Sequence, residues 1–138
     1  MTPNQINVAL IGCGRIAGHH INSIGAVEGV NLAAVCDLDA AKARPYGEDH
    51  DVPWYTNYRT MLAENPGVDT VAIITPSGMH HEHALDMIER YGKHVVVEKP
   101  TFMRPSQLDD ALAAADRAGV RIFPVFQNRY NKAVTRVR

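Results

Sequence analysis

Residues 6–17 read INVALIGCGRIA. The stretch begins with an apolar run and continues directly into a G-x-G-x-x-A pattern formed by Gly12, Gly14 and Ala17. Residues 15–27 carry apolar side chains at helical spacing. A strand that passes through two glycines into a helix predicts a phosphate-binding loop. In such a loop Gly12 makes the tight turn, Gly14 lets a pyrophosphate approach the backbone, and Ala17 lets helix and strand pack closely.

The predicted helix start is a favourable place for an anion. Its free backbone N–H groups, here those of Arg15 and Ile16, and the helix dipole both favour negative charge. Asp37 ends the next apolar run, about 20 residues after Ala17, where dinucleotide-binding domains carry an acid for the adenosine ribose hydroxyls. A carboxylate repels a 2′-phosphate, and Leu38 follows where an NADP enzyme often has arginine. The sequence therefore predicts NAD as the ligand, with NADP less favoured.

Short apolar runs alternate with amphipathic stretches along the chain. We expect strands at residues 6–11, 31–36, 54–55, 69–75, 94–97 and 120–126, and helices at 15–27, 39–49, 58–64, 81–91 and 105–118. Pro45 stands inside one of these helices as a potential breaker. This alternation predicts an α/β fold with a doubly wound parallel sheet of the Rossmann type. A different α/β fold, such as the flavodoxin type with a glycine turn and a surface Asp37, stays open.

Composition narrows the class of protein further. The chain has 138 residues, enough for one domain, and its formal net charge of -1 gives no electrostatic footprint for nucleic acid or an anionic membrane. No apolar run is long enough for a transmembrane helix, and the polar N-terminus does not resemble a signal peptide. Two cysteines, Cys13 and Cys36, are too few for a disulfide framework, so we expect reduced thiols in a cytoplasmic protein.

Two polar loops follow expected strands. Residues 75–80 read TPSGMH, and residues 98–101 read EKPT. In a doubly wound sheet, ligands bind beyond the carboxyl ends of the strands, which is where both loops belong. A lysine at that place can hold a substrate hydroxyl or assist the loss of its proton.

The glycine loop, Asp37, residues 75–80 and residues 92–100, which read GKHVVVEKP, together resemble the glucose-fructose oxidoreductase / inositol dehydrogenase (Gfo/Idh/MocA) family. The resemblance covers essentially the whole chain. It implies an NAD(P)-dependent oxidoreductase that acts by hydride transfer on a hydroxyl of a sugar, an inositol or a related compound. It also implies that Lys99 is catalytic and that Glu98 contacts the nicotinamide ribose region.

The motif and the resemblance together give a set of candidate cofactor-binding residues. They are Gly12, Gly14, Arg15, Ile16, Ala17, Asp37, Thr75, Pro76, Ser77, His80, Glu98 and Lys99. Ser77 stands where the family often has asparagine, although its hydroxyl can still hydrogen-bond. His20 matches a histidine common in the first helix of the family, and we expect it to pack rather than to catalyse. His80 and His83 are one helical turn apart, but no further ligand completes a set, so we expect no metal site.

Residues 127–131 read QNRYN and resemble the family branch that oxidises nucleotide-sugar hexuronates for lipopolysaccharide assembly. With Lys99, the residues Asn128 and Arg129 are therefore candidate substrate contacts. Family members usually carry a second domain that supplies much of the substrate pocket and the main oligomer interface.

We accordingly expect residues 1–126 to form the dinucleotide-binding domain and residues 127–138 to begin the connection to a substrate domain that this chain lacks. The chain alone is expected to bind NAD and to turn over little substrate, whereas the whole protein is expected to be a homo-oligomer. The alternative is a non-catalytic NAD-binding or regulatory module of the same fold. Lys99 argues against it, because a sensor has no need of a base at the nicotinamide end.

Overall fold

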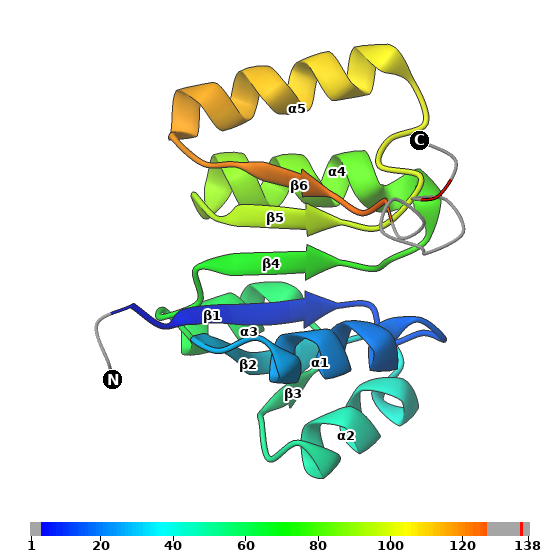
Figure 1. Ribbon diagram of the computed structural model, residues 1–138, viewed down its shortest axis with the longest axis vertical. Helices are drawn as coiled ribbons and strands as arrows, with labels where there is room; N and C mark the ends of the chain where they lie inside the picture. Colours follow the sequence, from blue (N-terminus) through cyan, green and yellow to red (C-terminus); the bar gives the residue numbers. More distant parts are fainter. Residues whose placement is uncertain (1–3, 127–135, 137–138) are drawn as a thin grey trace.

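The computed structural model describes residues 4–126 and residue 136. Within them, six parallel strands form one sheet in the order β3-β2-β1-β4-β5-β6 (Figure 1). The strands are β1 (Ile6–Ile11), β2 (Val30–Cys36), β3 (Trp54–Tyr55), β4 (Thr70–Ile73), β5 (His94–Val97) and β6 (Ile122–Pro124). This is the strand order of the dinucleotide-binding doubly wound fold, and it differs from the flavodoxin order, in which the third strand lies beside the first. The Rossmann prediction is confirmed, and the flavodoxin alternative is excluded.

Helices connect successive strands and lie on both faces of the sheet (Figure 1). They are α1 (Ala17–Ala26), α2 (Ala40–Asp49), α3 (Tyr58–Glu64), α4 (His80–Leu85), its π-helical continuation η2 (Asp86–Arg90) and α5 (Pro105–Ala118), with a short 3₁₀ turn η1 (Ser77–Met79) before α4. Because each crossover returns the chain to the same edge of the sheet, every strand ends on the side where the polar loops begin.

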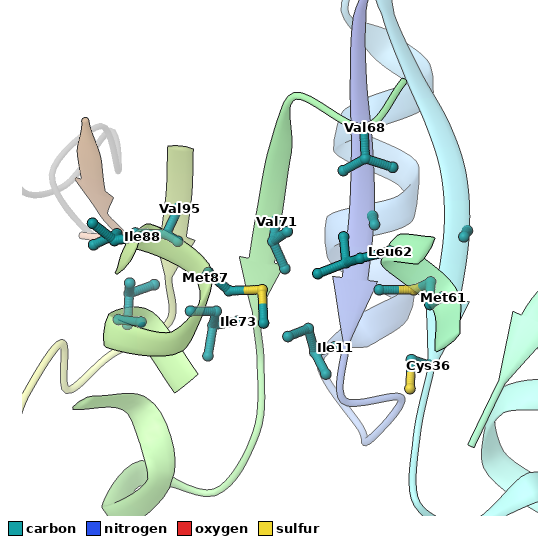
Figure 2. Close-up of a cluster of buried hydrophobic side chains, with 14 of the residues drawn as sticks. Ile11, Cys36, Met61, Leu62, Val68, Val71, Ile73, Met87, Ile88 and Val95 are labelled. Carbon is teal, nitrogen blue, oxygen red and sulfur yellow. The ribbon is translucent and has the colours of Figure 1, made fainter. Parts of the chain in front are cut away.

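Two apolar clusters sandwich the sheet. One cluster lies under α3, η2 and α5 and centres on β4 and β5 side chains; Figure 2 shows Met61 and Leu62 of α3 packed toward Ile11, and Met87 of η2 beside Ile73. The other cluster joins α1 and α2 to the opposite face of the sheet. β4 is fully buried, because one apolar cluster covers each face of the sheet there. This explains why its sequence is an unbroken apolar run.

Side-chain caps mark the starts of α2 and α3. The Asp39 side chain accepts the N–H of Ala41 and caps α2, and the Asn57 side chain accepts the N–H of Arg59 and caps α3. Pro45 lies inside α2 without ending it. Its side chain is exposed, and water can satisfy the carbonyl that loses a helical partner.

Several predicted elements differ from the observed ones in their bounds. The helix expected at 15–27 is limited to Ala17–Ala26, and the elements expected at 31–36 and 39–49 each differ by one residue at their start. The strand expected at 69–75 is limited to Thr70–Ile73, and the strand expected at 120–126 is limited to Ile122–Pro124. β6 is an edge strand paired with β5 at three positions. Arg121 and Val125 on either side of it still hydrogen-bond β5, but β5 itself ends at Val97, so the ladder does not continue. The single helix expected at 81–91 is instead α-helical to Leu85 and π-helical over the next five residues.

Candidate functional site

The glycine loop joins β1 to α1 at the carboxyl edge of the sheet. Gly12 has φ 97°, and a Cβ placed on it would lie 2.5 Å from the carbonyl oxygen of Ile74. Both the backbone conformation and the close approach to the end of β4 therefore require glycine at this position. The loop is held tightly against the neighbouring strand.

Neither backbone conformation nor a close neighbouring atom explains why residue 14 is a glycine. It has no positive φ, and a Cβ placed on it would meet no atom within 4 Å. In the described part of the chain, the N–H groups of Gly14, Arg15 and Ile16 donate no hydrogen bond, and the first turn of α1 carries no acidic residue. Open space beside free N–H groups at a helix N-terminus fits the pyrophosphate of a dinucleotide.

Asp37 follows β2 and is half-buried beside this loop. Its Oδ2 accepts the N–H of Cys13 at 2.8 Å, and its Oδ1 accepts the N–H of Asp39 at 2.8 Å. The carboxylate thus fastens the glycine loop to the end of β2. Each oxygen keeps a second acceptor position, which suits the two hydroxyls of a ribose. Leu38 beside it is 87% exposed and brings no positive charge for a 2′-phosphate.

Cys13 and Cys36 are buried free thiols behind the loop. Burial, with the nearby charge of Asp37 as a second cause, raises the pKa of each thiol to about 12. The Cys13 Sγ donates to the carbonyl oxygen of Cys36 at 3.5 Å. Both sulfurs therefore stay protonated at neutral pH and pack as small apolar groups rather than act as nucleophiles.

The second part of the site is the turn after β5. Lys99 is exposed there, whereas Glu98 is only 7% exposed. One carboxylate oxygen of Glu98 accepts the N–H of Lys99 at 2.6 Å, and the other lies 3.0 Å from the Nε2 of His20 on α1. Glu98 therefore ties the lysine turn to the helix that begins at the glycine loop.

His80, at the start of α4, joins the two polar loops. It is buried, with its Nε2 2.7 Å from the carbonyl oxygen of Thr75 and its Nδ1 2.8 Å from that of Pro100. One turn later, the Nδ1 of His83 lies 2.8 Å from the Thr75 hydroxyl. The sequence predicts His80 as a cofactor contact. In the structure both its ring nitrogens face the backbone, so any contact with the cofactor is through the carbon edge of the ring.

Two adjacent pockets lie at this edge of the sheet and share Ile16 and Glu98. One has a volume of about 280 Å³ and is lined by Ile16, Ile74, Thr75, His80, Glu98 and Lys99. The other has a volume of about 440 Å³ and is lined by Ile16, His19, His20, Ser23, Glu98 and Val125. Larger depressions lie beside β3 and between α3 and η2, but they contain none of the predicted site residues.

The structure thus brings the separate sequence motifs to one edge. Ile16, Thr75, His80, Glu98 and Lys99 share a pocket wall, and Gly12, Gly14, Ala17 and Asp37 form the adjoining loop. Arg15 and Pro76 are exposed near it, and Ser77 begins η1. The candidate substrate contacts Asn128 and Arg129, and the predicted connection at 127–138, lie outside the described residues apart from position 136.

The sequence predicts that His20 packs rather than catalyses, and the structure pairs it with Glu98. The partners are 78 residues apart, so no local pattern connects them. The one available signal is that His20 lies on the first turns of the helix after the glycine loop, close to the carboxyl edge.

Over the residues that the structure describes, no three histidine, cysteine, aspartate or glutamate side chains gather as a metal site. The same residues include no helix with the length and apolar character needed to cross a membrane.

Comparison with known proteins identifies the relatives of this chain. A family model described as "Oxidoreductase family, NAD-binding Rossmann fold" (GFO_IDH_MocA) matches residues 6–126. The NAD⁺-dependent scyllo-inositol 2-dehydrogenase of Bacillus subtilis is 28% identical over 134 residues, which is 94% of this chain and 38% of that protein.

Two solved structures have closely similar folds. The WlbA dehydrogenase from Bordetella pertussis, in complex with NADH and UDP-GlcNAcA, has a TM-score of 0.88 and 33% identity over 96% of this chain and 40% of its own. A mutant of KijD10, a 3-ketoreductase from Actinomadura kijaniata in complex with TDP-benzene and NADP, has a TM-score of 0.88 and 25% identity over 97% of this chain and 42% of its own.

The chain spans between 38% and 42% of the length of these three proteins. The match of the family model to residues 6–126, the strand order and the glycine loop agree with one another. The chain belongs to the Gfo/Idh/MocA oxidoreductase family, and it contains the NAD-binding Rossmann domain of that family.

Proposed function

We propose that this chain is the cofactor-binding part of an NAD-dependent dehydrogenase that oxidises a hydroxyl of a sugar-type compound. The observation that carries the proposal is the position of Lys99, which is exposed on the wall of the pocket formed by Ile16, Thr75 and Glu98. A flexible amine at that place has a use only if a second molecule enters beside the cofactor. A domain that merely senses NAD needs no such group.

The proposed mechanism assigns a task to each part of the site. NAD, when bound, supplies a nicotinamide ring that accepts a hydride. The free N–H groups at the start of α1 hold the pyrophosphate, and the Asp37 carboxylate accepts hydrogen bonds from the adenosine ribose. The Glu98 carboxylate stands at the nicotinamide end. Lys99 hydrogen-bonds the substrate hydroxyl and assists the loss of its proton as the carbon loses its hydride.

We further propose a nucleotide sugar as the substrate, in the lipopolysaccharide branch of the family. Two observations support this choice over a free sugar or an inositol. The WlbA relative, which is crystallised with UDP-GlcNAcA, is 33% identical to this chain, against 28% for the scyllo-inositol enzyme. The resemblance of residues 127–131 to that branch points the same way.

The remaining parts of the proposal concern the whole protein. Residues 1–126 form one functional domain, residues 127–138 lead toward a substrate domain, and the full-length protein is a homo-oligomer. The buried free thiols Cys13 and Cys36 support a reducing cytoplasmic location. Hydride transfer requires the substrate carbon to be held close to the nicotinamide in the correct orientation. This chain alone therefore binds NAD but converts little substrate. Steady-state NADH production by the isolated chain would contradict this last point.

The decisive experiment uses the complete gene product and a panel of nucleotide sugars, free sugars and inositols, with NADH formation followed by its absorbance. The wild-type protein is expected to oxidise a nucleotide sugar. Lys99→Met is expected to lower kcat by about 10²- to 10⁴-fold and to weaken NAD binding much less, because proton transfer is the proposed catalytic task of the amine and the cofactor keeps its other contacts.

Two other results would change the assignment. Oxidation of inositols alone would refute the nucleotide-sugar choice and leave the dehydrogenase proposal standing. Binding of NAD with no oxidation of any compound in the panel would favour the non-catalytic module instead.

A further inference from the structure

The lysine turn is anchored on both sides by histidines from different helices. Before Lys99, the Glu98 carboxylate is paired with His20 of α1 at 3.0 Å. After Lys99, the Pro100 carbonyl is 2.8 Å from the Nδ1 of His80 on α4. The candidate catalytic residue therefore lies between two fixed points, although its own side chain is exposed.

Of these two contacts, the one between His20 and Glu98 joins two side chains. Both partners are largely removed from water, with side-chain exposures of 16% for His20 and 9% for Glu98. The other oxygen of Glu98 accepts the N–H of Lys99 at 2.6 Å, so the same carboxylate touches α1 and the lysine backbone. A hydrogen bond to a buried charged acceptor is stronger than one between neutral groups, and its loss leaves the carboxylate under-satisfied.

His20 also lies on the helix that follows the glycine loop. Ala17 begins α1, and its N–H donates to the carbonyl oxygen of Gly14 at 3.1 Å. One short helical segment therefore links the phosphate-binding end of the site to Glu98 at the other end. Glu98 forms part of the wall of both pockets, so its orientation decides the shape of each.

We propose that His20 is a positioning residue that sets the orientation of Glu98, and through it the Lys99 backbone, for the nicotinamide half of the cofactor. The inference rests on the proposed function, because it assumes that the nicotinamide lies at the Glu98–Lys99 turn. His20 holds Glu98 through the Nε2 hydrogen and does not itself contact the reacting atoms. The adenosine half of the cofactor, held by the glycine loop and Asp37, does not depend on it.

The separate contributions of the two halves of the cofactor can be measured with two ligands, using the wild-type chain of 138 residues. ADP carries the adenosine and the two phosphates, but neither the nicotinamide nor its ribose, whereas NADH carries the whole cofactor. The ratio of the Kd for ADP to the Kd for NADH therefore reports what the nicotinamide half contributes to binding. Calorimetry gives both constants, and the emission of the reduced nicotinamide checks the second.

Three variants and one control separate positioning from general damage. His20→Leu removes the hydrogen bond, whereas the amide of His20→Gln reaches nearly the place of the original Nε2. The amide of His20→Asn is too short to reach it. His50→Leu is the control, because His50 is exposed at the C-terminal end of α2, and helices in this fold end at the edge of the sheet away from the site.

We expect His20→Leu and His20→Asn to lower the ratio about tenfold, with the Kd for ADP within about twofold of wild type. His20→Gln is expected to restore most of the ratio, and His50→Leu to leave it unchanged. If His20→Leu does not fold, the comparison of the glutamine and asparagine variants carries the same test.

Three outcomes would overturn the inference. If the wild-type ratio is well above one and His20→Leu and His20→Asn leave it unchanged, the role of His20 is refuted and the proposed function stays intact. Equal weakening of both ligands, without rescue by glutamine, would show a merely structural histidine. A wild-type ratio near one would contradict the nicotinamide position itself, and the proposed function and the inference would fall together.

Discussion

At the residue scale, Asp37 has two tasks where the sequence predicts one. The distance from Ala17 and the position after a strand indicate a ribose ligand. The structure adds that the same carboxylate accepts two backbone N–H groups, from Cys13 and Asp39. The residue that we propose to select the cofactor therefore also shapes the glycine loop. A spacing rule identifies the acid but cannot show which backbone groups fold back onto it.

Substitution of Asp37 should consequently affect stability as well as binding. Asp37→Ala removes both charge-assisted hydrogen bonds and should lower the free energy of unfolding by about 1–3 kcal/mol. Asp37→Asn keeps one acceptor oxygen and should lose less. Urea unfolding followed by circular dichroism measures both variants. If the alanine variant were as stable as wild type, the carboxylate would not be fastening the loop.

At the element scale, most of the fold follows from local sequence. The bounds of α3, β5 and α5 coincide with those predicted, because a cap, an unbroken apolar run or a terminal glycine marks each end. The π-helical turn η2 has no such marker, and the helical pattern of the sequence continues through it. The contacts of His20 and His80 are also beyond local reasoning, since each joins loops or helices that are distant along the chain.

The packing of α2 on β3 can be tested with a pair of glycines. A Cβ at Gly47 would lie 2.8 Å from the Trp54 side chain, whereas a Cβ at Gly25 on α1 would meet nothing within 4 Å. Gly47→Ala should therefore destabilise the chain by about 1–3 kcal/mol through overpacking. Gly25→Ala should stabilise it by up to about 1 kcal/mol, because alanine favours helix.

The chain has one tryptophan, so the emission of Trp54 reports on the same contact. Gly47→Ala should shift that emission, and Gly25→Ala should not. Equal stability of the two variants would show that the Trp54 side chain can move away from α2 at little cost, contrary to the tight contact described.

At the scale of the whole molecule, the strand order separates two folds that the sequence alone leaves open. Alternation of strands and helices fits both the dinucleotide-binding and the flavodoxin arrangements, because both are doubly wound. Which strand lies beside β1 depends on the side of the sheet's first pair to which the chain goes after β2: β3 lies beyond β2 here, but beside β1 in the flavodoxin order. Apolar periodicity does not contain that information. The observed neighbour β4 brings the Thr75 loop next to the glycine loop and so assembles the site.

Buried titratable groups should limit stability at both ends of the pH range. Burial lowers the pKa of His83 from its ordinary value of 6.5, so the unfolded chain takes up that proton first and stability falls below about pH 6.5. Burial raises the pKa of Cys13 and Cys36 from 9.0 to about 12, so the unfolded chain loses those protons first. Stability should therefore also fall as the pH rises from about 9 toward 12.

Urea midpoints measured from about pH 5 to about pH 10 test both limits. His83→Asn should flatten the acidic side, because asparagine can still bond the Thr75 hydroxyl but does not titrate. His50→Asn, at an exposed site, should leave the curve unchanged. An acidic loss of the same size in His83→Asn and wild type would rule out His83 as its source.

The central claim is that the glycine loop and Asp37 bind NAD in preference to NADP. It is tested most directly by calorimetric titration of the chain with each cofactor under identical conditions. NAD should bind more tightly than NADP, because the fixed carboxylate of Asp37 accepts the ribose hydroxyls and repels a 2′-phosphate. Asp37→Ala should weaken NAD binding and narrow the difference between the two Kd values. Tighter binding of NADP than of NAD by the wild-type chain would refute the role of Asp37.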